Sequence, residues 1–419
     1  MEVGYGERDI TPPLGIRLGG YADRFGKPST LVHDQLFIKS IYIGGHKDLL
    51  LLSADLLGIY KKFADDIKSA IRKEVGKISV FFATTHTHSA PETIIPMWVN
   101  TFPYSYEEKT LLSGWMESLK EKAVEAAVEA YYNASRASVK YCSTTVPNLT
   151  YNRSYKNGLV DPQLSIIYFN CKNNNKILIT NYACHPVCNT DLGISADYPG
   201  ELSARLLKYG FKNFFTLGAS GNIDPIRKGR EFASKMGKVL SNNIIECLKG
   251  SIELSCESLN IETRKLSLKL RKPPINKANK KIFSILRVVN PRFLRLLLRF
   301  WGSGATKLLY MDELETIKDD RDIIETIIQV FTMDNELAFI TIPGEPFVEI
   351  GAKIKKIASS LGYKAVIIAT CSDDYIGYIP TKEAFKLEIY ETKLARWSRV
   401  TDEAENIICR EIKKMLVPV

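Results

Sequence analysis

Short apolar runs and amphipathic segments alternate along the chain, and their spacing predicts the secondary structure. Apolar runs and strict apolar–polar alternation are typical of strands, whereas apolar residues recurring every three or four positions are typical of helices. The predicted strands are 36–43, 48–53, 78–83, 164–169, 176–182, 213–217, 323–333 and 337–342. The predicted helices are 60–73, 106–132, 200–209, 231–249 and 347–361.

Some of these strands are close enough in sequence to form hairpins. The expected pairs are 164–169 with 176–182 and 323–333 with 337–342, and the alternation over 254–270 also indicates paired strands. Hairpins interspersed with helices predict an α/β fold, in which mixed β-sheets are flanked by helices. This pattern argues against a purely parallel Rossmann layout.

We find no internal repeat and no linker, so residues 1–419 are predicted to form a single domain. Within it, Pro273-Pro274 and Gly302-Ser303-Gly304 bracket a predicted basic, amphipathic insertion at 271–310. The chain has a net charge of +10, but residues 264–311 contain 13 Lys or Arg and no Asp or Glu, which leaves −3 elsewhere. The positive charge is therefore local, which argues against a protein that coats nucleic acid and predicts one basic surface.

Residues 281–301 lie within this basic block and predict an amphipathic helix. Arg292, Arg295 and Arg299 fall on one stripe at helical spacing, and leucines and aromatic residues cover the remainder. Basic amphipathic helices with aromatic residues commonly lie in a membrane interface, so we expect contact with an anionic membrane surface. The alternatives are a buried helix with arginines at its rim, or a nucleic-acid patch.

The sequence predicts a cytoplasmic protein that also contacts the membrane surface. The first eight residues are polar, so no signal peptide is expected, and no apolar stretch is long enough to span a bilayer. The eight cysteines are scattered without Cys-x-x-Cys spacing, which is typical of reduced thiols.

Chemistry-bearing residues follow several of the predicted strands. His86-Thr87-His88-Ser89 comes directly after the 78–83 run, and alternate side chains of an extended backbone would point both imidazoles into one cavity. His185, Glu345 and Tyr378 follow other strands. Imidazole and carboxylate are ligands that zinc prefers, so the joint position predicts a metal site. Separately, each has an ordinary interpretation: His185 as a loop histidine, Glu345 as a helix-start carboxylate and Tyr378 as a core aromatic.

These motifs resemble those of the neutral ceramidase family. His86-Thr-His88-Ser-Ala-Pro is similar to the family's His-Thr-His-Ser-Gly-Pro signature, and further segments follow in the family's order from about residue 4 to 391. They are Asp9-Ile-Thr-Pro-Pro, Gly19-Gly-Tyr21, Asn152-Arg-Ser154, Ala183-Cys-His-Pro186, Ile194-Ser-Ala-Asp-Tyr-Pro-Gly200, Pro343-Gly-Glu345, Tyr375-Ile-Gly-Tyr-Ile-Pro-Thr381 and Tyr390-Glu391. The resemblance implies a ceramidase-like catalytic domain and a zinc amidohydrolase that cleaves the N-acyl bond of ceramide.

The resemblance also implies roles for individual residues. His86, His185, Glu345 and a tyrosine would hold Zn²⁺, and the spacing after Gly344-Glu345 favours Tyr378 over Tyr375. His88 and Arg153 would polarise or position the substrate amide, and Tyr375 joins them as a catalytic residue. Asp55 and Asp197 are further candidates, expected to orient the ligand imidazoles.

Two departures from the family pattern bear on substrate and mechanism. In the family's Ser-x-x-Gly-Asn/Asp-x-Ser-Pro stretch, this chain has Gly218 where the serine belongs, and Ser220 lies two residues away. The chain also ends about 28 residues after Glu391, where secreted ceramidases continue into a β-sandwich. We therefore expect a short intracellular member whose substrate need not be ceramide.

Three functional hypotheses follow. The first is hydrolysis of an N-acyl amide of a lipid or other amphiphile by zinc-activated water, since zinc held by two imidazoles and a carboxylate lowers the pKa of its water towards ~7. The second is hydrolysis of a soluble amide or ester, such as an acylated amino sugar. The third is an inactive metal-binding protein that docks on membranes.

Overall fold

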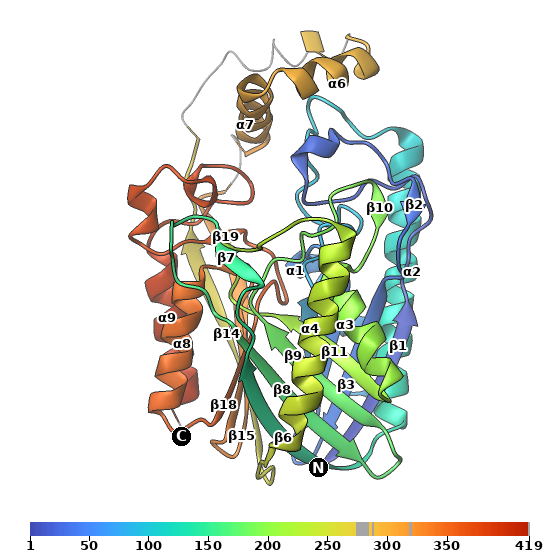
Figure 1. Ribbon diagram of the computed structural model, residues 1–419, viewed down its shortest axis with the longest axis vertical. Coiled ribbons are helices and arrows are strands. Elements are labelled where there is room, and N and C mark those ends of the chain that lie inside the picture. The colour runs from blue at the N-terminus through green and yellow to red at the C-terminus, as the bar shows by residue number, and fades with distance from the viewer. Residues whose placement is uncertain (274–284, 287–288, 318–320, 418–419) are drawn as a thin grey trace.

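Two β-sheets stacked face to face form the middle of a four-layered structure, and helices cover both outer faces (Figure 1). The computed structural model describes residues 1–273, 285–286, 289–317 and 321–417 of the 419-residue chain. The fold is α/β with mixed sheets flanked by helices, as predicted from the sequence.

The larger sheet has nine strands within these described ranges. In spatial order they are β11 (Phe211–Leu217), β9 (Lys176–Tyr182), β8 (Gln163–Cys171), β6 (Ser135–Thr145), β1 (Glu2–Asp9), β3 (Phe37–Gly44), β4 (Leu49–Ala54) and β5 (Ser79–Thr84), with β13 (Ile252–Glu253) beside β6. The pairs β4–β5 and β9–β11 are parallel, while most others are antiparallel.

The smaller sheet has the order β14 (Leu259–Lys269), β15 (Ile323–Met333), β16 (Leu337–Thr341) and β18 (Ala365–Ala369). Its inner face packs on the larger sheet, where the Phe81 and Phe331 ring centroids are 5.9 Å apart. In the part of the chain that the structure describes, three short pairs lie outside both sheets: β2 (Leu31–Val32) with β10 (Gly193–Ile194), β7 (Thr150–Asn152) with β12 (Ile223–Pro225), and β17 (Glu345–Pro346) with β19 (Tyr378–Ile379).

Six long helices cover the outer faces of the sheets. They are α1 (Lys61–Val75), α2 (Tyr106–Tyr132), α3 (Asp197–Lys208), α4 (Arg230–Lys249), α8 (Val348–Ser360) and α9 (Ala404–Leu416). The first four pack on the larger sheet and the last two on the smaller. In β5, Val80 and Phe82 face the α1–α2 layer while Phe81 and Ala83 face the second sheet. This burial on both faces explains the continuous apolar run in the sequence.

An insertion that contains α6 (Pro291–Phe300) and α7 (Ser303–Ile317) separates β14 from β15 in the sequence. The two strands are neighbours in the sheet and pair along their whole length. Figure 1 shows both helices at one end of the molecule, opposite the chain termini. The insertion was predicted to cover 271–310, but in the structure residues 302–304 lead into α7 and the chain rejoins the sheet only at β15. Part of the predicted 281–301 helix (281–284 and 287–288) lies outside the described residues.

The structure confirms both predicted hairpins and corrects one strand prediction. β8–β9 and β15–β16 are antiparallel neighbours. The predicted pair within 254–270 is wrong: one strand, β14, covers 259–269 and its partner is β15. The alternation there reflects a strand with one buried face, and nothing in a single strand's pattern tells where its partner is. Strands β1 and β6 and helix α9 were not predicted.

A buried ion pair links α1 to the segment that follows β18. The Lys68 ammonium contacts the Asp373 carboxylate, and both side chains are buried. The same carboxylate accepts a hydrogen bond from the Phe82 N–H (2.9 Å), and the Asp373 N–H donates to the Phe82 carbonyl (2.6 Å). The pair therefore fixes residues 371–378 against the end of β5.

We predict that Lys68→Met destabilises the protein by about 3–5 kcal/mol, because it leaves the Asp373 carboxylate buried without its cation. The matched control is Lys61→Met on the same helix, whose partner Asp65 is partly exposed, and the expected cost there is at most about 1 kcal/mol. Urea unfolding of the three proteins measures both values. Equal losses in the two variants would contradict the assigned role of the buried pair.

Candidate metal site

The carboxyl ends of four strands, two from each sheet, meet at the end of the molecule where α6 and α7 lie. His86 follows β5, His185 follows β9, Glu345 follows β16, and Tyr375 and Tyr378 follow β18. All five side chains are buried. The structure thus brings together every residue for which the sequence predicted metal ligation.

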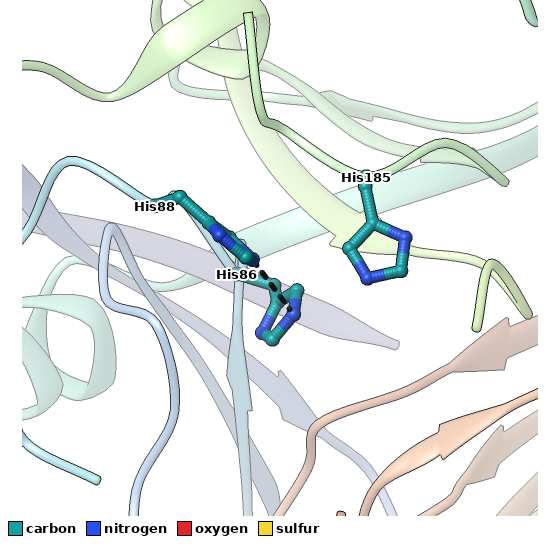
Figure 2. A group of neighbouring side chains, drawn as sticks. All are labelled: His86, His88 and His185. Carbon is teal, nitrogen blue, oxygen red and sulfur yellow. Dashed lines mark hydrogen bonds between the residues drawn. The ribbon is translucent and has the colours of Figure 1, made fainter. Parts of the chain in front are cut away.

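The two histidines of the His-Thr-His motif converge, though through a different backbone than predicted. His86 has φ of 64°, in the left-handed region, so the segment turns and is not extended. The Nε2 atoms of His86 and His88 lie 3.4 Å apart (Figure 2). Gly20, with φ of 89°, passes so close that a Cβ there would lie 2.3 Å from His88 Nδ1. This explains why the Gly19-Gly20-Tyr21 motif accompanies the histidines.

Backbone carbonyls orient the imidazoles of His86 and His185. His86 Nδ1 faces the Leu57 carbonyl, and His185 Nδ1 lies 3.1 Å from the Ile223 carbonyl. A carbonyl accepts a proton only from Nδ1–H, which leaves the Nε2 lone pair of a neutral imidazole free for a metal.

The expectation that Asp55 and Asp197 orient these rings is wrong. Their carboxylates accept backbone N–H groups instead, Asp55 from Phe37 (2.9 Å) and Asp197 from Asn189 (2.7 Å) and Tyr198 (2.8 Å). Aspartates that bind backbone N–H groups in this way cannot be distinguished from ligand-orienting ones by sequence position alone.

The Glu345 carboxylate faces both free nitrogens. Its Oε2 lies 2.7 Å from His185 Nε2 and 3.3 Å from His86 Nε2, and its Oε1 accepts a hydrogen bond from the Tyr375 hydroxyl. A neutral imidazole has only one N–H group. Neither ring can therefore donate a hydrogen bond both to its carbonyl and to the carboxylate. The lone pairs of the imidazole nitrogens and of the carboxylate oxygen then face one another, and a cation between them would bind both. These nitrogen and oxygen donors are of the kind that zinc binds.

The electrostatics of the metal-free site agree with this requirement. Burial alone would raise the pKa of the Glu345 carboxyl, but the neighbouring His86 and His185 imidazoles hold it well below its usual value. The pKa of His88 is lowered well below its ordinary value by burial and by the same two imidazoles. Nδ1 of His88 has no hydrogen-bond partner among the described residues. Burial also lowers the pKa of His185, whereas for His86 the opposing effect of burial is outweighed by Cys371 and Glu345, which raise its pKa well above the ordinary value. A carboxylate and one positive charge are therefore favoured together at the centre of the site.

Arg153 fixes the tyrosine that the sequence predicted as a ligand. Its guanidinium donates to the Tyr378 hydroxyl (3.0 Å), to Glu391 (2.7 Å), to Asp224 (2.9 Å) and to the Gly221 carbonyl (2.9 Å). Burial raises the pKa of Tyr378 well above its usual value despite Arg153, so the hydroxyl is protonated in the metal-free site. Arg153 thus holds Tyr378 in place through a network in which Glu391 and Asp224 were not predicted.

A cavity of about 30 Å³ adjoins the candidate ligands. Besides Gly20, its remaining wall is apolar or aromatic and consists of Leu57, Ile94, Ile95, Met97, Tyr390 and Trp397. A space of this size holds about one water molecule. Most of these wall residues come from irregular segments, and only Gly20 and Tyr390 had a sequence signal, as parts of the Gly-Gly-Tyr and Tyr-Glu motifs.

Ser220 lies in the turn between β11 and β12, where its carbonyl accepts a hydrogen bond from the Ile223 N–H (2.8 Å). Gly218, which replaces the family serine, is packed so closely on Ala183 that a Cβ would lie 3.0 Å from its Cα. The backbone around β9 therefore leaves little room for a side chain at position 218.

The fold and the side-chain cluster together define a four-layered α/β protein with a buried histidine–carboxylate site. Solved structures identify the fold further. The neutral ceramidase from Pseudomonas aeruginosa has a TM-score of 0.77 at 18% identity, covering 100% of this chain and 75% of its own. A ceramidase complexed with C2 has a TM-score of 0.74 at 16% identity, covering 99% and 74%. The chain has the neutral ceramidase fold, as the motifs predicted.

Two comparisons based on the sequence find no relative. No model of a protein family matches the chain, and no curated protein matches it. The likeness therefore rests on the three-dimensional fold and on the motifs, and it leaves activity to be argued from the site.

We predict one bound metal ion per chain, lost nearly completely in His86→Ala and in His185→Ala, because each removes a nitrogen donor. The control is His46→Ala, which changes an exposed histidine and should leave the metal content unchanged. His88→Ala decides between two ligand sets. Retained metal supports His86, His185, Glu345 and Tyr378, whereas loss supports the three-histidine group, whose nitrogens lie within 4.8 Å of one another. Metal analysis of the purified proteins measures all four.

Proposed function

We propose that this protein is a zinc-dependent hydrolase of an N-acyl amide, acting on a ceramide-like lipid or a related amphiphile. The observation that carries the proposal is the Glu345 carboxylate facing two imidazoles whose other nitrogens are held by carbonyls, beside a water-sized cavity. The neutral ceramidase fold supports it, since the two solved structures compared above are both ceramidases.

In this proposal His86, His185, Glu345 and Tyr378 hold the zinc ion. When bound, zinc supplies a Lewis acid that polarises the amide carbonyl and makes water a nucleophile near neutral pH. The Tyr375 hydroxyl donates a hydrogen bond to Glu345 Oε1, which keeps Oε2 turned towards the imidazoles. Tyr375 is therefore a positioning residue.

His88 is the proposed general base and acid. Its Nε2 lies 3.4 Å from Nε2 of the candidate ligand His86, where it can accept a proton from the attacking water and then donate it to the leaving nitrogen. Nδ1 has no hydrogen-bond partner among the described residues and is buried beside Gly20, so the other nitrogen, Nε2, is the one that faces the candidate ligands. Arg153 is engaged by four partners, so we assign it to holding Tyr378 and, through it, the reaction geometry.

The apolar wall favours an acyl chain as part of the substrate. Ile94, Ile95 and Met97 face the candidate ligands across the cavity, which suits a molecule with a polar amide at one end and hydrocarbon at the other. The cytoplasmic location expected from the sequence stays a prediction.

We predict that kcat/KM rises with acyl length across a series of N-acyl substrates, by up to about fourfold per buried methylene, since each contributes about 0.8 kcal/mol. A metal-loaded wild-type protein assayed against chains of increasing length measures this trend. Activity that is highest on short, soluble amides or esters would instead favour the second hypothesis. The absence of any hydrolysis would favour an inactive metal-binding protein.

We predict that Ser220→Ala retains activity within about tenfold, a barrier change of ~1.4 kcal/mol, because water is the nucleophile and the serine contributes its carbonyl to a turn. His88→Ala should lose on the order of 10²-fold or more, as is typical of general acid–base groups. Steady-state rates of metal-loaded variants with wild-type melting temperatures provide the comparison. An inactive but folded, metal-loaded Ser220→Ala protein would favour a serine nucleophile.

A further inference from the structure

Helix α6 exposes large apolar side chains. Phe300 is 83% exposed and the adjoining Trp301 59% exposed, and Phe293, Leu296 and Leu297 are exposed beside them. At 100° per residue, Phe293, Leu297 and Phe300 form one stripe, and the exposed Arg292 and Arg299 flank it on one side. A contiguous apolar surface of this kind on a soluble helix marks an interaction site.

The opposite side of α6 is already occupied. Leu294 and Leu298 are buried in the apolar cluster that also contains Ile94, Ile95 and Met97 of the site wall. Arg295 donates to the Phe25 carbonyl (3.0 Å) and lies 4.8 Å from the centroid of the Phe102 ring. The single stripe of three arginines predicted from the sequence is therefore divided: Arg295 anchors the helix and the other two face outwards. A helix that is apolar on both sides has an outer face without a partner among the described residues.

We propose that the outer face of α6 docks on an anionic lipid surface, with its apolar stripe in the interface and Arg292 and Arg299 at the head groups. The charge of the region selects this partner. Over residues 289–311 the described chain carries Arg292, Arg295, Arg299 and Lys307 and no acidic residue, so the face offers no carboxylate to the arginines of a second copy. Large aliphatic and aromatic side chains beside arginines are typical of helices that lie in the interface. No helix within the described residues is long and apolar enough to cross a membrane.

Docking in this orientation places the candidate site close to the lipid. Thr101, which follows the wall residue Met97 by four positions, donates its N–H (2.8 Å) and its hydroxyl (2.7 Å) to the buried Asp312 carboxylate of α7. Glu313, also on α7, binds Arg396, whose guanidinium donates to the Pro96 carbonyl (2.6 Å). The insertion is thus bonded to both ends of the 96–101 segment, next to the cavity. The docking surface itself is independent of whether the site hydrolyses amides.

The test is co-sedimentation of the full-length protein with liposomes at low salt. Binding to vesicles with anionic lipid, weakening with salt, and little binding to zwitterionic vesicles are expected. Arg292→Gln/Arg299→Gln should lower the partition coefficient by about 25-fold, because each basic residue at an anionic surface contributes about fivefold. Phe300→Ser/Trp301→Ser should lower it by at least about tenfold through lost apolar burial.

Matched control variants lie at the opposite end of the sheets. Lys47→Gln/Lys172→Gln removes two exposed charges in the β3–β4 and β8–β9 turns, and Tyr132→Ser removes a 73% exposed aromatic at the end of α2. Both controls should bind like wild type, and all variants should keep the wild-type melting temperature.

Three outcomes would overturn the proposal. One is a wild-type protein that does not bind anionic vesicles at low salt. Another is equal losses in the α6 variants and the controls. The third is a wild-type dimer in solution that the α6 variants convert to monomer, which would assign this face to a second copy of the chain. Because the readout is binding, failure of the proposed hydrolase activity would leave these results unchanged.

Discussion

The packing of the two sheets places a single carboxylate opposite two imidazoles whose outer nitrogens face backbone carbonyls, and the whole candidate site depends on this arrangement. Glu345 comes from the smaller sheet, and His86 and His185 come from the larger one. The two sheets must therefore end at the same level for the site to exist. Their packing through Phe81, Phe331 and the surrounding apolar residues sets that level, so the core is part of the site's geometry.

Residues with a strained backbone, and a close contact between backbone and side chain, lie where the strands end. His86, Cys371 and Asp373 all have positive φ, a conformation that costs residues other than glycine about 1 kcal/mol or more. The bonds of Asp373 to Lys68 and to Phe82 offset this cost from one side, and the passage of Gly20 beside His88 confines the rings from the other. A site held in this way loses little entropy when it binds an ion, which is what a preorganised metal site requires.

The sequence predicted those features that depend on local periodicity or on side-chain chemistry. The 78–83 strand was readable because both of its faces are buried, and His86, His185 and Glu345 stood out as polar residues at strand ends. It did not reveal groups that act through the backbone, such as the Leu57 carbonyl, because every residue has one. Trp397 could not be found either, since it reaches the cavity from an irregular segment whose path depends on the whole fold.

The insertion between β14 and β15 adds a surface without disturbing the sheet. The two strands keep a continuous register, and a longer connection costs little, about 0.6 kcal/mol for each doubling of its length. The inner faces of α6 and α7 join the cluster that contains Ile94, Ile95 and Met97. The segment that contributes Ile94, Ile95 and Met97 to the cavity wall is also bonded to α7, since Thr101 donates to Asp312. The insertion therefore helps to set the position of one wall of the cavity, whichever surface α6 contacts.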